Sequence, residues 1–397
     1  MIEDFARRID AISLASLRET GATKWSSDDG AIGAFVAEMD FGVDPRIAAA
    51  LHRAIDEGMF GYLPGRLGTG LADAVSAYVG DQYGWSVESS DVKPISDVIA
   101  AFQFALARRL VPGEKLIVPT PSYMPFLRVA HMAGVEVIEM PLSIVDGRYE
   151  FDLTALEAAF ASGGRLLVLS NPFNPVGRVF SAAELRDISE IVERHDGSVF
   201  SDEIWAPLVY PGHTHVPYAS VSRASATHTL TAMSASKAWN LPGLKCAQLV
   251  LSNDRDREDW DRFGSSVRGP SNLGVIANTV AFRDGGEWLA DTLDYLTGNR
   301  DRLIDLLGTE LPSLWMPIPE GTYVGWIDFR SLNLGESPAD FFTREAGVKL
   351  TDGSSCGAAG IGYARLIFGT PRPILERIVK QLAAAVRRQA PTSSGVG

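Results

Sequence analysis

Short apolar runs alternate with amphipathic helical stretches through the middle of the chain. The runs typical of buried strands are 115–119, 165–170, 198–201 and 229–232. Between two of them, Ser181-Ala-Ala-Glu184 forms a capping box and begins a stretch with apolar positions at helical spacing. Alternation of strands and helices over about 200 residues predicts a mostly parallel α/β sheet that is covered by helices on both faces.

The pattern changes after residue 285. Residues 320–329 and 363–368 read as strands, and 338–346 and 373–388 read as helices. These elements predict a smaller α+β domain. We therefore expect a large α/β domain at 45–285 and a small domain formed by the N-terminal segment 1–44 and residues 286–390. The small, polar tail at 391–397 is predicted to be disordered.

Composition and charge exclude several classes of partner. The 397 residues carry a formal net charge of −13 without a block rich in lysine or arginine, which argues against a nucleic-acid groove or an anionic membrane surface. No apolar run is long enough to span a bilayer, and the N-terminus lacks the apolar core of a signal peptide. Two cysteines, Cys246 and Cys356, do not make a disulfide framework, so a cytoplasmic location is predicted.

The most informative chemical group is Lys237, which follows the apolar run at 229–232 and the serines Ser234 and Ser236. Alone, this pattern is more typical of a surface lysine after a strand. Asn174 and Asp202 lie upstream, each after its own apolar run. Together they offer an amine for an aldehyde, a carboxylate for a ring nitrogen and donors for a ring hydroxyl and a phosphate. Pyridoxal 5′-phosphate (PLP) needs this set of groups.

A candidate phosphate site lies at the start of the helix that Asp97 caps. The free amides of Val98 and Ile99 in its first turn form a ready anion cradle, and Ser234 and Ser236 would add hydroxyl donors. A plain capped helix explains the same residues without a ligand.

Three other candidates would contact the ring of the cofactor. Asp202 would hold the pyridine nitrogen protonated, unless it is only a buried helix cap. Tyr123 could stack on the ring, or pack as an ordinary aromatic residue. Asn174, in a turn bounded by prolines, could donate to the phenolic oxygen. Glu203 is expected to be a hydrogen-bonded structural partner rather than a catalyst.

Two further patterns concern substrate and metal. Arg365, in a predicted strand, is the candidate clamp for a substrate carboxylate, with a surface salt bridge as the alternative. His213 and His215 lie in a loop rich in proline and glycine without an evident third and fourth ligand, so no metal site is predicted.

The chemical residues belong to a longer ordered set of motifs. These are Thr23-Lys-Trp25, Val36-Ala-Glu-Met-Asp-Phe41, Phe60-Gly-Tyr62, Pro121-Ser-Tyr-Met-Pro-Phe126, Asn171-Pro-Phe-Asn-Pro-Val-Gly177, Asp202-Glu-Ile204, Ser236-Lys-Ala-Trp-Asn240, Gly321-Thr-Tyr-Val-Gly-Trp-Ile-Asp328 and Ala364-Arg-Leu366. The set resembles the fold-type-I PLP-dependent enzymes of the aminotransferase class I/II superfamily over nearly the whole chain. The Lys-Trp and Glu-Met-Asp-Phe pieces resemble more narrowly the MalY/PatB-type cystathionine β-lyases, which are C–S lyases.

The resemblance implies a role for each candidate. Lys237 is similar to the Schiff-base lysine, Asp202 to the partner of the pyridinium, Asn174 to the phenolate contact, Tyr123 to the stacking ring and Arg365 to the carboxylate clamp.

Two further residues gain roles only from the resemblance. Tyr62 is similar to a tyrosine that reaches the cofactor phosphate of the neighbouring subunit, which implies a homodimer with shared active sites. Lys245 lies eight residues after Lys237, where many relatives place an arginine on the phosphate.

Three positions depart from the pattern of the family. Trp205 stands where a histidine is usual, Cys356 where a phenylalanine is usual, and Ile367 where an asparagine is usual. All three are expected near the substrate side of the site or the carboxylate clamp.

The implied activity is PLP-dependent β-elimination of cystathionine or a related cysteine S-conjugate to a thiol, pyruvate and ammonia. The amine of Lys237 would remove the α-proton as general base. An aminotransferase shares the early steps, and no single residue separates the two outcomes. A non-catalytic regulator that binds the cofactor is the third alternative.

Overall fold

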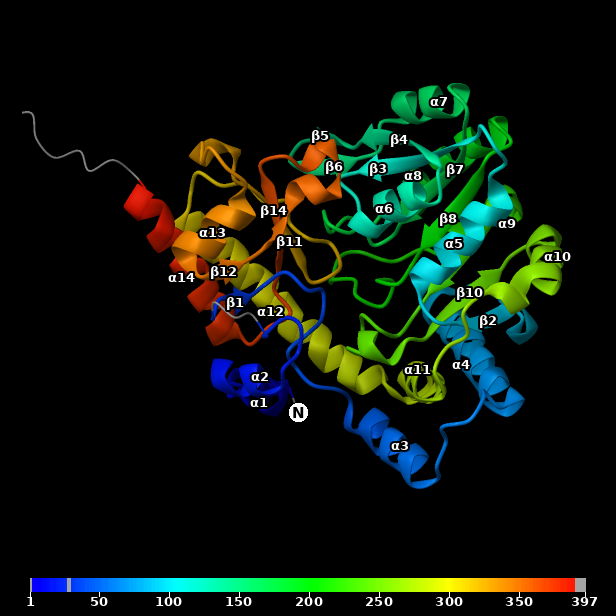
Figure 1. The fold of residues 1–397 in the computed structure, drawn as a ribbon, viewed down its shortest axis with the longest axis horizontal. Helices are drawn as coiled ribbons and strands as arrows, with labels where there is room; N and C mark the ends of the chain where they lie inside the picture. Colours follow the sequence, from blue (N-terminus) through cyan, green and yellow to red (C-terminus); the bar gives the residue numbers. More distant parts are fainter. Residues whose placement is uncertain (1, 27–29, 390–397) are drawn as a thin grey trace, which may run out of the picture.

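The large sheet has seven strands in a computed structural model that describes residues 2–26 and 30–389 (Figure 1). The predicted tail at 391–397 lies outside these residues. The strand order is β2-β10-β9-β8-β7-β3-β4. The strands are β2 (Val92–Ile95), β3 (Lys115–Thr120), β4 (Glu136–Pro141), β7 (Gly164–Ser170), β8 (Ser198–Asp202), β9 (Thr229–Met233) and β10 (Ala247–Leu251). Within this sheet β10 alone runs opposite to the other six strands, so the predicted mostly parallel sheet is confirmed.

Helices cover both faces of this sheet because successive side chains of each strand point to opposite sides. Along β7, Leu166 and Val168 join a core with α5 (Val98–Arg109) and α6 (Met124–Met132). Leu167 and Leu169 face the other core, with α7 (Leu153–Ala161) and α8 (Ala182–Arg194). Helices α9 (Arg223–His228) and α10 (Asp254–Phe263) also belong to this part.

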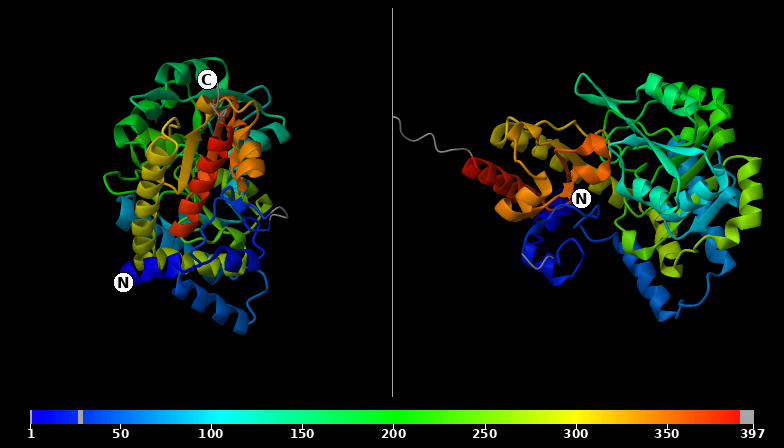
Figure 2. Two further views of the ribbon diagram at one scale, coloured as in Figure 1. Left: turned by 90° about the vertical axis from the view of Figure 1, so that its left-hand side faces the viewer. Right: turned by 45° about the horizontal axis from the view of Figure 1, so that its top comes forward.

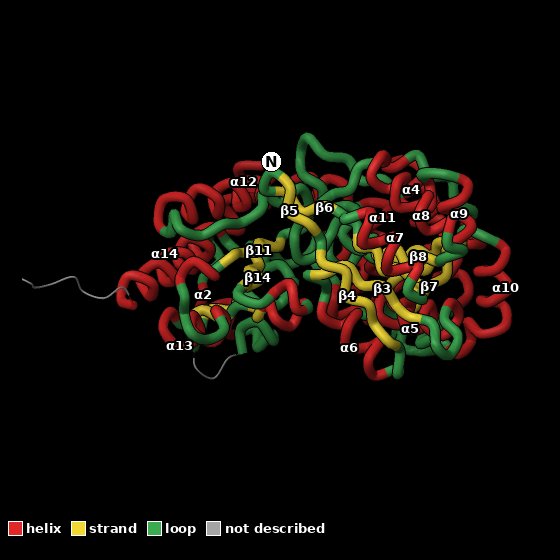
Figure 3. Tube along the Cα trace, turned by 90° about the horizontal axis from the view of Figure 1, so that it is seen from above, coloured by secondary structure: helices red, strands yellow, loops and turns green. Residues whose placement is uncertain are grey.

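A smaller antiparallel sheet lies beside the large one, on the left in Figure 1 and again in the view from above (Figure 3). Its order is β11-β14-β13, with β11 (Val324–Asp328), β13 (Thr351–Asp352) and β14 (Tyr363–Ile367). It is accompanied by α12 (Gly286–Glu310), α13 (Pro338–Ala346) and α14 (Arg372–Gln389). Helices α12 and α14 pack side by side (Figure 2). The smaller α+β part is thus confirmed, while the exact division at residues 44/45 and 285/286 stays a prediction.

The N-terminal segment joins the two parts. It contains α1 (Ile2–Asp10), α2 (Leu14–Glu19) and β1 (Ile32–Gly33), which pairs in parallel with β12 (Val348–Lys349). Helices α3 (Pro45–Asp56) and α4 (Gly65–Tyr83) then pack on α11 (Asn272–Asp284).

Strands β5 (Ser143–Val145) and β6 (Arg148–Glu150) form a hairpin. Short 3-10 helices cover Ser89–Asp91, Tyr218–Ser220, Pro242–Leu244, Gly264–Ser266, Arg330–Leu332, Gly353–Cys356 and Ala358–Gly360. None of the helices described has the length and apolar character that crossing a membrane requires.

Candidate active site

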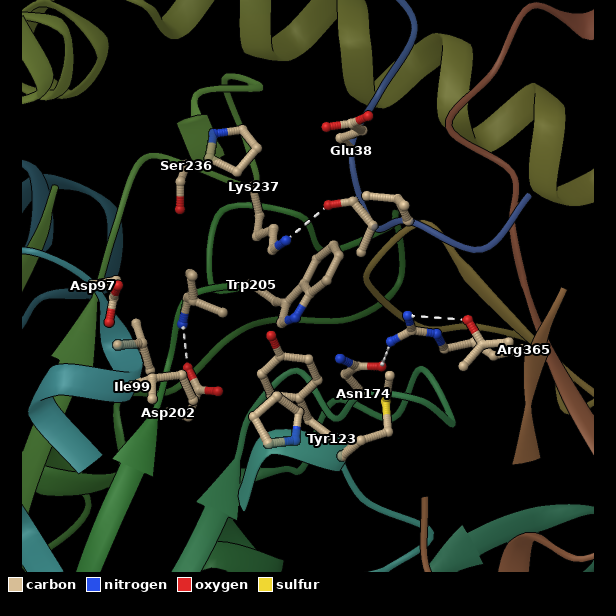
Figure 4. Close-up of a pocket in the computed structure, with 18 of the residues that line it drawn as sticks. Glu38, Asp97, Ile99, Tyr123, Asn174, Asp202, Trp205, Ser236, Lys237 and Arg365 are labelled. Atoms are coloured by element: carbon tan, nitrogen blue, oxygen red, sulfur yellow. Dashed lines mark hydrogen bonds between the residues drawn. The ribbon is translucent and has the colours of Figure 1, made fainter. Parts of the chain in front are cut away.

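A cavity of about 970 Å³ opens where the carboxyl ends of the parallel strands meet the N-terminal segment and the small sheet (Figure 4). Open α/β sheets bind ligands at this edge. Strand β8 ends at Asp202, and Lys237 follows the end of the neighbouring strand β9. The predicted residues in the cavity wall are Val98, Ile99, Tyr123, Asn174, Asp202, Ser236, Lys237, Lys245 and Arg365. Ser234 and Tyr62 are not part of the wall.

The amine of Lys237 lies in the middle of this cavity. Its Nζ donates to the carbonyl oxygen of Ala37 at 2.7 Å and lies 5.5 Å from the centre of the Trp205 ring. Burial, and secondarily the nearby guanidinium of Arg365, lower the pKa of Lys237 to about 8. The side chain can therefore become a neutral, nucleophilic amine close to physiological pH.

Asp202 is a buried carboxylate that uses only one of its oxygens inside the protein. Its Oδ1 accepts from the backbone N–H of Ile204 at 3.2 Å in a turn, so Asp202 does not cap a helix, which was the alternative role. No donor within the described residues reaches Oδ2. Burial raises the pKa of Asp202 to about 7. A protonated ring nitrogen bound in the cavity would supply the cationic partner that this carboxylate lacks.

Arg365 is a buried guanidinium that forms no ion pair in the described part of the chain. Its Nη1 donates to Asn174 Oδ1 at 3.2 Å, its Nη2 donates to the carbonyl oxygen of Phe35 at 3.0 Å, and its Nε has no acceptor. Burial lowers the pKa of Arg365. The alternative of a surface salt bridge is therefore wrong, and the arrangement suits a ligand carboxylate. Since the Asn174 oxygen is occupied, the amide nitrogen of Asn174 is left to donate to a ligand.

The predicted anion cradle forms at the start of α5. Asp97 caps the helix by accepting from Ala100 N at 2.8 Å, which leaves the amides of Val98 and Ile99 without helical acceptors. Nζ of Lys245 lies 3.2 Å from Asp97 Oδ2 and brings a positive charge to the same corner. These groups favour a bound phosphate.

The structure corrects the role of Ser234. Its hydroxyl lies behind the cavity wall, bonded to the Cys246 carbonyl at 2.7 Å, and it accepts from the backbone N–H of Ser236 at 3.0 Å. The chain leaves the strand at Met233, so the two serines no longer share one face. Ser236 lines the cavity, while Ser234 fixes the loop that carries Ser236 and Lys237.

The two tyrosines differ in position. Tyr123 is half-buried in the wall at the N-terminus of α6, and burial raises its pKa. Figure 4 shows it on the same side of Lys237 as Asp202. Tyr62 is fully exposed on the loop before α4 and lies outside this chain's cavity.

Of the three departures from the family pattern, only Trp205 lines the cavity. Its ring packs edge-on against Tyr323 at 4.7 Å between centroids. Cys356 and Ile367 are buried behind the wall, and Cys356 is close enough to the Arg365 guanidinium for the two groups to influence each other's pKa, as expected for a residue near the carboxylate clamp. The carbonyl of Cys356 accepts from Ser122 N at 2.8 Å, and the backbone N–H of Ile367 donates to Ala34 O at 2.9 Å.

Glu203 has the structural role that was expected for it. Its carboxylate accepts from Ser201 Oγ at 2.8 Å and from Tyr218 N at 3.0 Å, and it lies 3.0 Å from Nε2 of His215. In residues 2–26 and 30–389, no group of three histidine, cysteine or acidic side chains could hold a metal ion.

Sequence reasoning assigned no role to the segment that forms one cavity wall, Phe35–Glu38. A buried ion pair between Lys24 Nζ and Asp40 Oδ2 at 2.8 Å anchors it, and Trp25 Nε1 donates to the other oxygen of Asp40 at 2.8 Å. The Lys-Trp and Glu-Met-Asp-Phe motifs were the available signal. They were recognised as markers of a family, but not as groups that contact each other.

The groups in the cavity fit PLP in chemistry. Comparisons with known proteins agree. The family model "Aminotransferase class I and II" matches residues 36–382. Cystathionine β-lyase of Corynebacterium glutamicum is 35% identical over 377 residues, 94% of this chain and 99% of the relative. Cystathionine β-lyase PatB of Bacillus subtilis strain 168 is 30% identical over 392 residues, 96% of this chain and 100% of the relative.

A solved structure extends this similarity to the fold. The PLP-bound C–S lyase from Staphylococcus hominis superposes with a TM-score of 0.88 at 26% identity, covering 94% of this chain and 97% of that protein. The chain therefore belongs to the aminotransferase class I and II family of fold-type-I PLP-dependent enzymes, in the branch of the MalY/PatB-type cystathionine β-lyases.

Proposed function

We propose that this protein is a PLP-dependent C–S β-lyase that cleaves cystathionine or a related cysteine S-conjugate. The observation that carries the proposal is the amine of Lys237, which lies in a cavity between a buried carboxylate and a buried guanidinium without a carboxylate partner. With cystathionine, the reaction consumes one water and yields homocysteine, pyruvate and ammonia.

Residues beside the ends of six strands of the large sheet would hold the cofactor. The amides of Val98 and Ile99, with Ser236 and Lys245, would bind its phosphate. The ring would lie beside Tyr123, with its nitrogen on Asp202 and its phenolic oxygen on the Asn174 amide nitrogen. When bound, PLP supplies an electron-withdrawing ring that stabilises negative charge at the substrate α-carbon.

The protein's own groups then orient the substrate and move its proton. Arg365 binds the α-carboxylate and fixes the Cα–H bond relative to Lys237. The amine of Lys237, whose pKa burial lowers to about 8, accepts the α-proton as general base. The bond between Cβ and sulfur breaks, and the thiolate leaves with the bonding electron pair.

The test uses purified holoenzyme and L-cystathionine, with pyruvate followed by a coupled dehydrogenase. Pyruvate formed without any added keto acid supports the lyase. Amino transfer that requires a keto acid, with no pyruvate released in its absence, would assign the chain to the aminotransferases instead. Tight cofactor binding without turnover of any amino acid would favour the regulator.

Lys237→Ala should lower pyruvate formation by about 10²-fold or more. Lys380→Ala, which removes an exposed lysine on α14, is the matched control and should leave the rate unchanged. Wild-type turnover in Lys237→Ala would contradict the mechanism.

The assembly and location of the enzyme also remain proposals. We propose a homodimer in which Tyr62 reaches the neighbour's cofactor phosphate, a role that the full exposure of its ring supports. Tyr62→Ala should then lower cofactor affinity, whereas an unchanged affinity would contradict this role. Two buried free cysteines, Cys246 and Cys356, suit the cytoplasm predicted from the sequence.

A further inference from the structure

Glu38 is a cavity residue for which the proposed chemistry has no use. It belongs to the N-terminal segment and lies on the side of Lys237 opposite Asp202 and Tyr123 (Figure 4). The side chain is half-buried, and within the described residues no hydrogen bond or ion pair reaches its carboxylate. Burial, as the largest influence, raises the pKa of Glu38.

The other acidic groups of the cavity wall already have partners or a role. Asp97 caps α5 and pairs with Lys245. Asp202 bonds Ile204 N and is proposed to hold the cofactor ring. Glu38 is therefore the carboxylate of the described wall that remains available to a cationic ligand. The charged part of such a ligand would lie away from Asp202.

The volume of the cavity is consistent with a ligand that extends past the reacting carbon. At about 970 Å³, its volume is near the upper end of the usual range for small-molecule sites. The cavity has to hold the cofactor as well as the substrate. Arg365 would bind one end of an amino-acid substrate. Glu38 is then a second, oppositely charged group, suited to a distal ammonium.

We propose that Glu38 binds the distal ammonium of thioether substrates that carry an amino-acid group at both ends, and so favours them over conjugates without that charge. This inference rests on the proposed lyase function. It adds a residue that selects the substrate to those that carry out the reaction.

A competing role for Glu38 is to tune Lys237 electrostatically. The charged and titratable groups near Glu38 are Lys24, Asp40, Lys237 and Tyr323. Lys24 is already paired with Asp40 at 2.8 Å, which leaves Lys237 as the charge that Glu38 would influence. Tuning would change the rate with every substrate, whereas recognition of the distal ammonium would change binding of diamino substrates alone.

The experiment is a cycle of two changes, one in the enzyme and one in the substrate. Holoenzyme of the wild type and of Glu38→Gln is assayed for pyruvate release from L-cystathionine and from S-(3-carboxypropyl)-L-cysteine. The second compound lacks only the distal amino group of the first. Glu193→Gln, at an exposed position on α8, controls for the loss of one negative charge.

We expect Glu38→Gln to raise KM for L-cystathionine about tenfold, equivalent to about 1.4 kcal/mol. KM for the analogue should change less than about twofold, as should kcat with both substrates. The wild type itself should favour L-cystathionine in kcat/KM, and Glu38→Asp should recover part of this preference.

Two results would overturn the inference while leaving the lyase intact. One is an equal change with both substrates, or a shift in the pH profile of kcat with both, which would assign Glu38 to tuning of Lys237. The other is no change with either. If the wild type released no pyruvate from either compound, the proposed function and this inference would both fail.

Discussion

Replacing Asp202 by asparagine tests two effects of its buried negative charge. The charge should destabilise the cofactor-free protein, and it should strengthen binding of the cofactor. The variant keeps the shape of the side chain and an oxygen that can accept from Ile204 N–H. Burial raises the pKa of Asp202 from 3.8 to about 7. Each pKa unit corresponds to about 1.4 kcal/mol, so the ionised carboxylate destabilises the cofactor-free fold by up to about 4 kcal/mol. Water entering the open cavity reduces this, and we expect Asp202→Asn to gain about 2 to 4 kcal/mol at pH 8.

The pH dependence has a definite sign. Between about pH 4 and 7, folded wild-type protein holds a proton on Asp202 that the unfolded chain has lost. Its stability therefore falls as the pH rises through this window, and Asp202→Asn lacks that contribution. The advantage of the variant should be larger at pH 8 than at pH 5. With PLP bound the sign reverses, because the variant cannot pair with a protonated ring nitrogen and should bind the cofactor more weakly.

The assay is urea unfolding of the cofactor-free proteins at pH 5 and pH 8, together with titration of each with PLP. Asp187→Asn removes an exposed carboxylate on α8 and serves as the control. The reasoning is refuted if the stability difference between wild type and Asp202→Asn does not grow from pH 5 to pH 8.

Three further changes test other parts of the site. Arg365→Lys keeps the positive charge but loses the planar guanidinium that can donate two parallel hydrogen bonds to a carboxylate. KM should therefore rise at least about tenfold while PLP affinity stays constant. An unchanged KM in steady-state assays would argue against the carboxylate clamp. Lys24→Met leaves the Asp40 carboxylate buried without a cation and should cost about 3 to 5 kcal/mol in urea unfolding, whereas a loss below about 1 kcal/mol would contradict a structural ion pair. Ser236→Ala and Lys245→Ala should each weaken PLP binding about three- to tenfold in titrations of cofactor-free protein, and wild-type affinity in both would exclude them from the phosphate site.

The site residues that lie at or shortly after the ends of strands could be predicted from the sequence. Asp202, Lys237 and Asn174 each come shortly after an apolar run, and parallel strands place such positions at one edge of the sheet. The order of the motifs then identified the family. Because this information is local, it needed no knowledge of how distant segments pack.

The remaining features depend on contacts that spacing does not encode. Ser234 and Ser236 look equivalent in the sequence, yet in the structure Ser236 lines the cavity while the Ser234 hydroxyl contacts the Cys246 carbonyl and Ser236 itself. Glu38 enters the wall because its segment is anchored through Lys24. Ile367 lies two residues after Arg365, but packing against the N-terminal segment keeps it in the core.

The hydrogen bond between Arg365 Nη2 and the carbonyl of Phe35 joins positions 330 residues apart. A ribosome makes the Arg365 end of this bond 330 residues after the Phe35 end. Strands of the large sheet emerge in between, but the cavity cannot close until the C-terminal part has left the ribosome. The cofactor site is therefore completed only after Arg365 has emerged, and cofactor loading should follow synthesis of this whole stretch rather than accompany it.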